Sequence, residues 1–129
     1  MPQTRLEKKI TVTPEMLADH MGSGSLPVLA TPALAALFEG AAAELARQYL
    51  PEGVTTVGTE FAVRHNAPTP CGARLTAAAE LVSRGERDFR FRLSASDEAG
   101  PVAEGEHTRV SVRAEKFAAK AAARKKGGG

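Results

Sequence analysis

Two residues in the first half of the chain, Glu39 and His65, carry side chains that could take part in acid–base or nucleophilic chemistry. Glu39 lies in an alanine-rich segment predicted to be helical. His65 lies near the end of the segment that follows it, which is predicted to be a strand. A histidine titrates close to neutral pH, and a carboxylate can attack a carbonyl carbon or activate water. The sequence therefore predicts chemistry where this helix and this strand meet.

Small side chains surround Glu39 on its own side of the predicted helix, at alanine positions 35, 42, 43 and 46. A carboxylate on such a close-packing face needs a hydrogen-bond partner or a positive charge, or else its pKa rises, because desolvation of a charge is unfavourable. The alternative is that Glu39 reaches solvent past its small neighbours. For His65, the alternative to a catalytic role is a strand histidine satisfied by a neighbouring group. The sequence leaves both alternatives open.

Other chemically capable residues have weaker support. Cys71 lies in a Thr-Pro-Cys-Gly turn, and its thiol would need a base that the sequence does not place beside it. His107 and Arg109 share one face of a later strand, where packing or ion pairing at a dimer interface competes with catalysis. No Cys/His/Asp cluster has metal-ligand spacing, and no glycine-rich loop joins a strand to a helix. We therefore expect neither a metal nor a separate cofactor.

The pattern of elements predicts one long helix and five strands. The long helix opens at Thr31-Pro32, where threonine supplies an N-cap and proline suits the first turn, and it ends before Pro51. This capping role explains Thr31 without any chemistry. Thr13-Pro14 repeats the pattern and predicts a short helix that closes at Gly22. The strands are predicted over residues 5–12, 55–66, 74–82, 88–96 and 102–112.

Alternation along one strand shows how the sheet should be buried. The apolar residues Phe89, Phe91, Leu93 and Ala95 face one way, and Arg90, Arg92, Ser94 and Ser96 face the other. One face of the sheet is thus predicted to be buried and the other solvated. The long helix is apolar around most of its circumference, so it needs cover on several sides. An α+β fold meets both conditions if a five-stranded antiparallel sheet wraps around a long central helix.

Composition limits the class of protein. The chain has 129 residues, of which 43% are hydrophobic and 25% charged, and this suits one globular domain. A single cysteine excludes an internal disulfide framework, and no apolar run approaches the roughly 18 residues of a membrane-spanning helix. The N-terminal residues include no apolar segment typical of a secretory signal. We therefore expect a cytoplasmic protein that does not associate with membranes.

Positive charge gathers at the C-terminal end. Residues 113–129 include six basic side chains and one acidic one, whereas the rest of the chain is mildly acidic. Such an Ala/Lys/Arg tail ending in glycines is usually a frayed, solvated helix end, so we predict a single domain over 1–117 and a disordered basic tail over 118–129. The alternative is a role in binding an anion such as the phosphates of a coenzyme. Nucleic-acid binding is disfavoured, because the core lacks a basic stripe interleaved with aromatic residues.

Four segments of the chain, in order, carry a resemblance to a known family. They are Ala30-Thr31 with Glu39 in the helix, Val57-Gly58-Thr59, His65-Asn-Ala-Pro-Thr-Pro70, and Gly105-Glu-His-Thr-Arg109 followed by Glu115-Lys116-Phe117. With these segments the chain resembles the hotdog-fold acyl-CoA thioesterases, most closely the fluoroacetyl-CoA thioesterase-like group. The resemblance implies that Thr31, Glu39 and His65 are catalytic. It also implies that Gly58 lines the acyl pocket and that Arg109 lies near the site, so both are expected to contact substrate.

The resemblance further implies an enzyme that hydrolyses a short or medium acyl-CoA to the free acid and coenzyme A. It implies a homodimer with active sites near the subunit interface, where coenzyme A binds at the surface and its acyl end reaches inward. One departure bears on the substrate. Members devoted to fluoroacetyl-CoA carry phenylalanines just before the catalytic threonine, whereas Ser25–Ala30 is small and aliphatic here. A different short or medium acyl group is therefore expected.

The residue types suit thioester hydrolysis. Glu39 could attack the thioester or activate water, His65 could act as general base and acid, and a backbone N–H near Gly58 could bind the oxyanion, with Thr31 as an orienting hydroxyl. One alternative of another class is a non-catalytic hotdog module that binds an acyl-CoA without turning it over. A hydratase on the same fold would need an Asp/His pair near the start of the long helix, and we find none there.

Overall fold

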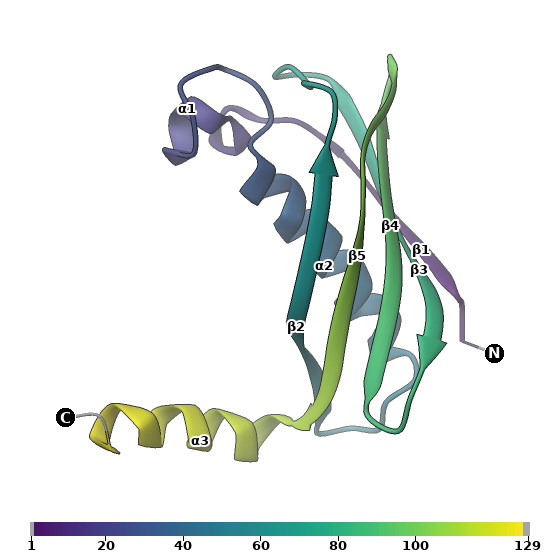
Figure 1. Cartoon of the computed structure of the whole chain (residues 1–129), viewed down its shortest axis with the longest axis vertical. Helices are drawn as coiled ribbons and strands as arrows, with labels where there is room; N and C mark the ends of the chain where they lie inside the picture. Colours follow the sequence, from purple (N-terminus) through teal and green to yellow (C-terminus); the bar gives the residue numbers. More distant parts are fainter. Residues whose placement is uncertain (1, 128–129) are drawn as a thin grey trace.

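A 17-residue helix, α2 (Thr31–Arg47), lies across one face of a five-stranded antiparallel sheet (Figure 1). The structure is a computed structural model that describes residues 2–127. In chain order the strands are β1 (Arg5–Thr11), β2 (Val54–His65), β3 (Arg74–Arg84), β4 (Asp88–Asp97) and β5 (Gly100–Arg113), and their order in the sheet is β1-β3-β4-β5-β2. The predicted α+β fold, with a five-stranded antiparallel sheet around a central helix, is confirmed.

The core forms between α2 and the inner face of the sheet. The α2 side chains Leu34, Phe38 and Leu45 have no exposed surface, and Phe91 and Leu93 of β4 belong to the same buried cluster. Along β4 the burial alternates as predicted, with Phe89, Phe91, Leu93 and Ala95 buried and the residues between them exposed. Each strand begins and ends within two residues of its predicted bounds, and α2 ends three residues before the predicted Leu50.

The segment between β1 and α2 differs from its prediction. The expected single helix from Thr13 to Gly22 is instead a 3₁₀ turn, η1 (Pro14–Met16), and a short helix, α1 (Ala18–Met21). Between them Leu17 is extended, with ψ of 147°, and forms an isolated β-bridge with Leu29. Leu17 is only 8% exposed, so its burial and its pairing interrupt the helix. Gly22 ends α1 in the left-handed conformation, as predicted.

Strand β2 forms one edge of the sheet, and its only strand partner among residues 2–127 is β5. The register shifts between Gly58 and Glu60, so Thr59 is the extra residue of a β-bulge. Because a bulge changes which residues face inward, the half-buried positions beyond it are Phe61, Val63 and His65. The bulge thus lets Thr56 and His65, near opposite ends of β2, both face inward.

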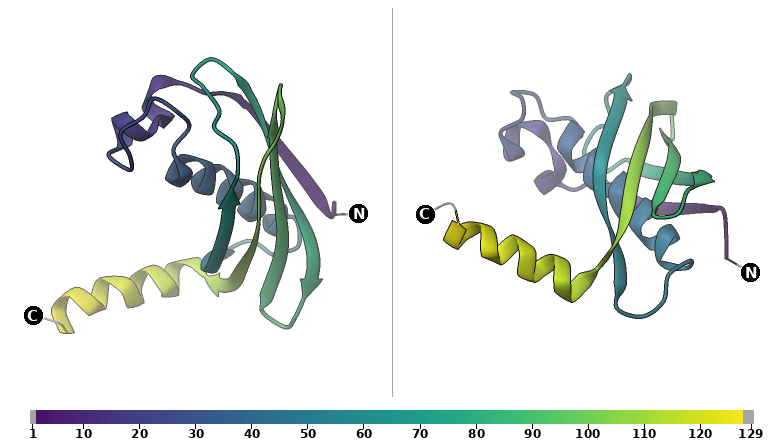
Figure 2. Two further views of the ribbon diagram at one scale, coloured as in Figure 1. Left: turned by 45° about the horizontal axis from the view of Figure 1, so that its top comes forward. Right: turned by 60° about the horizontal axis from the view of Figure 1, so that its bottom comes forward.

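The C-terminal segment forms a third helix, α3 (Ala114–Gly127), which leaves the end of β5 and projects past the β2 side of the sheet (Figures 1 and 2). Its side chains from residue 114 to 125 are all exposed. This differs from the disordered tail expected over 118–129, of which residues 128–129 lie outside the described part. The proposed domain division stays a prediction. Within residues 2–127 no helix is long and apolar enough to cross a membrane.

Candidate active site

Thr31 and His65 are joined directly, by a hydrogen bond of 2.8 Å between Thr31 Oγ1 and His65 Nδ1. Thr31 lies in the first turn of α2, and His65 is the last residue of β2. The N-cap of α2 is Ala30, so the prediction that Thr31 is the N-cap is wrong. Since the hydroxyl of Thr31 does not cap the helix, it is available to the imidazole.

The second nitrogen of His65 has an unusual environment. Nε2 is buried and has no hydrogen-bond partner within the described part of the chain. Burial lowers the pKa of His65, and the nearby backbone of Ala67 only partly offsets this effect, so the imidazole is neutral at pH 7. When the proton of the neutral ring is on Nδ1, the ring donates to the Thr31 hydroxyl oxygen and Nε2 is unprotonated. His65 can then accept a proton from a hydroxyl or a water, and its Nε2 can bond a group that enters the site.

A cavity of about 340 Å³ opens beside the Thr31–His65 pair. Its apolar wall includes Val28, Leu29 and Ala30 from the segment before α2, together with Ala67 and Pro68 after β2. The small aliphatic segment Ser25–Ala30, singled out by its composition, therefore supplies part of this wall. Leu26 is 64% exposed and does not line the cavity. The cavity suits a small apolar group whose reactive end lies against the polar pair.

Glu39 lies in a second group of residues, around the bulge of β2. A Cβ atom on Gly58 would lie 3.1 Å from Glu39 Oε2, 3.0 Å from His107 Cε1 and 3.4 Å from Arg109 Nη1. These three side chains therefore converge on a position that only glycine leaves open. Glu39 is exposed in the single chain, although Ala42 and Ala46 beside it are buried. Of the two alternatives for Glu39, the single chain thus shows the one in which its carboxylate reaches solvent.

His107 and Arg109 share the inner face of β5, as predicted, and form a buried hydrogen-bond network. Arg109 donates from Nε to Thr56 Oγ1 at 2.8 Å, from Nη2 to the Thr56 carbonyl at 3.0 Å and from Nη1 to His107 Nε2 at 3.1 Å. His107 Nδ1–H donates to the Glu60 carbonyl at 2.7 Å. Its Nε2 must therefore be the unprotonated acceptor.

The charges of this network follow from its burial. Arg109 is 8% exposed and His107 is 2% exposed. Burial lowers the pKa of His107, and the hydrogen bond to Glu60 only partly offsets this effect, so His107 is neutral. Burial also lowers the pKa of Arg109, whose guanidinium nonetheless stays charged because arginine titrates far above neutral pH. Arg109 is thus a fixed positive charge beside Gly58 and the Glu39 carboxylate.

The two groups lie apart within one chain. Thr31 and Glu39 are eight residues apart on α2, which corresponds to about 12 Å along the helix axis. No hydrogen bond or ion pair between described residues joins the Thr31–His65 pair to Glu39. Of the residues predicted to be functional, the structure therefore brings Thr31 to His65, and it brings Glu39 to Gly58 and Arg109.

Thr56 is a member of the network that was not predicted from the sequence. Its side chain and its carbonyl both accept hydrogen bonds from Arg109. The signal that could have identified it is its position two residues before Gly58, on the same face of the strand. Cys71 is exposed, and among the described residues its thiol forms one hydrogen bond, from Sγ to the Val12 carbonyl oxygen at 3.7 Å. The described residues include no group of three that could hold a metal ion.

Comparison with known proteins gives a consistent result. A sequence model of the fluoroacetyl-CoA-specific thioesterase family matches residues 12–115. The chain is 38% identical over 93 residues to a fluoroacetyl-CoA thioesterase of Streptantibioticus cattleyicolor. The aligned residues cover 72% of this chain and 67% of the relative.

Solved structures agree with this match. A mutant fluoroacetyl-CoA-specific thioesterase in complex with fluoroacetate and CoA is 31% identical, with a TM-score of 0.83 over 88% of this chain and 95% of that one. A hot-dog-like protein from Thermanaerovibrio acidaminovorans is 23% identical, with a TM-score of 0.85 over 94% of this chain and 90% of that one. This last similarity concerns the fold alone.

Proposed function

Because the chain belongs to the fluoroacetyl-CoA-specific thioesterase family and hydrolyses acyl-CoA thioesters, we propose that Thr31, Glu39 and His65 carry out this hydrolysis. Gly58 and Arg109 contact the substrate in this proposal. The observation that supports it is the 2.8 Å hydrogen bond between Thr31 and His65. The Nε2 atom of His65 is buried, has no hydrogen-bond partner among the described residues, and belongs to a residue that lines an apolar cavity. A proton acceptor that is buried, neutral and next to a small cavity suits acyl transfer to water.

In the proposed reaction, the thioester carbon is attacked either by the Glu39 carboxylate or by a water that Glu39 activates. A backbone N–H near Gly58 stabilises the oxyanion that forms, and the positive charge of Arg109 lies on the same side. The tetrahedral intermediate then releases the sulfur of coenzyme A. When water attacks, His65 takes its proton and passes it to the leaving thiolate. When Glu39 attacks, the thiolate leaves and a mixed anhydride forms; water then hydrolyses this anhydride, and His65 passes a proton of that water to the thiolate. In both routes Thr31 holds the ring of His65 in place.

We further propose that the enzyme is a homodimer formed along the edge strand β2. This edge is 12 residues long and has no strand partner on its outer side among the described residues, and such an edge readily pairs with another chain. A two-fold axis midway between Gly58 and His65 would place Gly58 of one protomer opposite His65 of the partner subunit. The Glu39 group of each chain would then meet a Thr31–His65 pair supplied by the other chain.

The proposed acyl group is short or medium in length and aliphatic, because Val28, Leu29 and Ala30 line the cavity. A panel of acetyl-, malonyl-, butyryl-, hexanoyl- and phenylacetyl-CoA tests this proposal through free-thiol release. We expect kcat/KM for butyryl-CoA to exceed that for acetyl-CoA by about tenfold, since two more methylene groups are buried. Malonyl-CoA should be hydrolysed slowly, because its carboxylate would lose its hydration. A preference for malonyl-CoA would contradict the proposed pocket.

The pH dependence of hydrolysis should reflect the lowered pKa of His65. The neutral imidazole is the active form, so activity is lost when the imidazole is protonated. Because the pKa of His65 is lowered, this loss occurs at a pH below the ordinary histidine pKa of 6.5. We expect kcat/KM to be maintained at pH 6.5 and to fall only at lower pH. The titration of His65 itself can be followed by NMR, with its signals identified by their absence in His65→Ala. A titration of His65 centred above pH 6.5 would contradict this expectation.

A further inference from the structure

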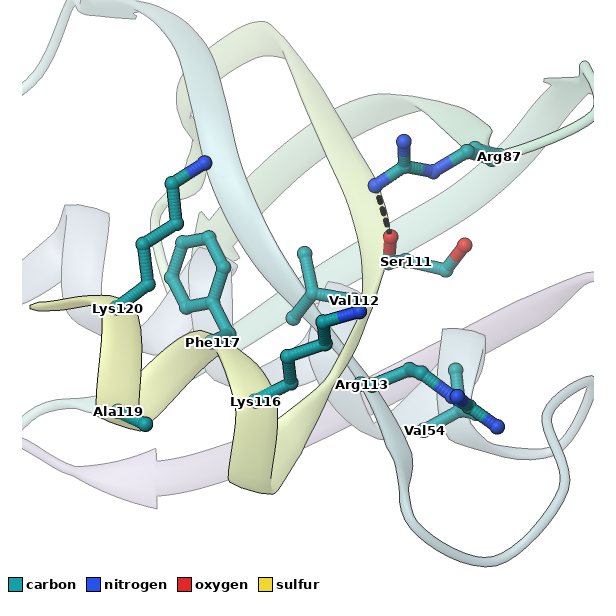
Figure 3. A pocket seen from close by; sticks show the side chains of 9 residues that line it. All are labelled: Val54, Arg87, Ser111, Val112, Arg113, Lys116, Phe117, Ala119 and Lys120. Carbon is teal, nitrogen blue, oxygen red and sulfur yellow. Dashed lines mark hydrogen bonds between the residues drawn. The ribbon is translucent and has the colours of Figure 1, made fainter.

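A second cavity, of about 810 Å³, lies at the opposite end of the β2–β5 ladder from His65 (Figure 3). It forms between α3 and the adjoining ends of β2 and β5. Its lining comprises Val54, Arg87, Ser111, Val112, Arg113 and the α3 residues Lys116, Phe117, Ala119 and Lys120. Four of these residues are basic and none is acidic. The cavity therefore combines an apolar surface with concentrated positive charge.

The basic side chains are arranged around an exposed aromatic ring. Figure 3 shows Lys116, Phe117 and Lys120 extending from α3 to the same side, toward β5. Phe117 is 42% exposed, which is high for a large apolar side chain next to the buried Val112. Arg87 is held in place because its Nη2 donates to the Ser111 carbonyl at 3.0 Å. None of the four cations takes part in an ion pair between described residues.

We infer that this cavity binds the nucleotide end of coenzyme A, with adenine against Phe117 and the phosphates among Lys116, Lys120, Arg87 and Arg113. An aromatic face suits a planar base, and ammonium and guanidinium groups suit phosphate oxygens. The inference rests on the proposed function, since it assigns the surface site that holds the carrier of the acyl group. It also gives a role to α3, an exposed 14-residue helix that would gain little stability in isolation.

The distance between this cavity and the Glu39 group suits coenzyme A. Gly58 pairs with Arg109, and Val54 pairs with Arg113 four residues along the same ladder. Four residues of strand span about 13 Å. The pantetheine arm of coenzyme A has about thirteen bonds between its sulfur and the nearest phosphorus atom, and four residues of backbone have about twelve. The extended arm is therefore about as long as the distance between the cavity and Gly58. A coenzyme with its phosphates at Lys116 can therefore place its thioester beside Gly58 and Glu39.

The test compares two double variants of α3 in the full-length chain. Lys116→Ala with Lys120→Ala removes two charges from the cavity, whereas Arg124→Ala with Lys125→Ala removes two charges from the same helix beyond it. For the first pair we expect KM for butyryl-CoA to rise about tenfold with kcat nearly unchanged, as charge-assisted bonds to the phosphates are lost. The control pair should leave KM within about twofold of wild type, because Arg124 and Lys125 do not line the cavity and salt screens their longer-range effect on the phosphates. Hydrolysis of butyryl-pantetheine, which lacks the nucleotide, should be equal in all three proteins.

Calorimetry with adenosine 3′,5′-bisphosphate separates this inference from the proposed function. Binding by the wild-type chain that is lost in the Lys116/Lys120 variant and kept in the control supports the nucleotide site even if no thioester is hydrolysed. An active enzyme in which the Lys116/Lys120 variant keeps the wild-type KM for butyryl-CoA overturns the nucleotide site and leaves the catalytic proposal standing. Equal losses in both double variants would also overturn it, since they would show a general effect of charge.

Discussion

His65→Ala should lower kcat for acyl-CoA hydrolysis by about a thousandfold, the range expected for loss of a general acid–base group. In the wild-type structure, His65 bonds the Thr31 hydroxyl through Nδ1 and presents Nε2 beside the acyl-sized cavity. Alanine cannot move a proton at either position. KM should change by no more than about twofold, because the groups proposed to hold the coenzyme are elsewhere. Initial rates of thiol release across a range of butyryl-CoA concentrations measure both constants.

Substitutions at Thr31 and His20 are the controls for this result. Thr31→Val keeps the shape of the side chain but removes the hydroxyl, so it should lower kcat, and Thr31→Ser should restore most of it. His20→Ala removes an exposed histidine at no predicted site and should leave both constants unchanged. Near-wild-type turnover by His65→Ala would refute its proposed role. If wild type and variants alike bound coenzyme A without releasing thiol, the non-catalytic binding module would be the better description.

The sheet and the central helix could be predicted from local patterns. In β4, Phe89, Phe91 and Leu93 alternate with charged and polar residues, and this period of two is visible without knowledge of any distant contact. The same holds for the apolar spacing of Leu34, Phe38 and Leu45 along α2. Short turns between β3, β4 and β5 then restrict the pairing of these strands to hairpins. Elements whose burial is periodic were therefore predicted with small errors at their ends.

The departures occur where contacts distant in sequence decide the outcome. Leu17 would continue a helix by local preference, but it is extended because it pairs with Leu29. Thr31 has the sequence context of an N-cap, but its hydroxyl bonds His65, 34 residues later in the chain. Alanine neighbours predicted the small-residue face around Glu39, but the carboxylate of Glu39 lies beside Gly58, which comes much later in the chain. None of these contacts has a local sequence signal.

Mixing Glu39→Gln protomers with His65→Ala protomers should restore about a quarter of the wild-type activity if each active site uses residues from both chains. Each variant alone should be inactive. In a mixed dimer, one site would combine both defects, and the other would combine Glu39 of the His65→Ala chain with His65 of the Glu39→Gln chain. Random exchange gives mixed dimers half of the time, and each mixed dimer has one intact site. The measurement is thiol release after subunit exchange, with different affinity tags used to quantify mixed dimers.

The result distinguishes two arrangements that the single chain allows. Glu39 and the Thr31–His65 pair lie about two helical turns apart on α2, roughly 12 Å, which is too far for both to contact one thioester carbon from the same chain without movement. A second copy paired along β2 closes this gap, because it brings His65 of the partner subunit opposite Gly58. Recovery of activity that follows the fraction of mixed dimers would support this arrangement. If mixed dimers form and stay inactive, each site belongs to one chain, and α2 or the end of β2 must move during catalysis.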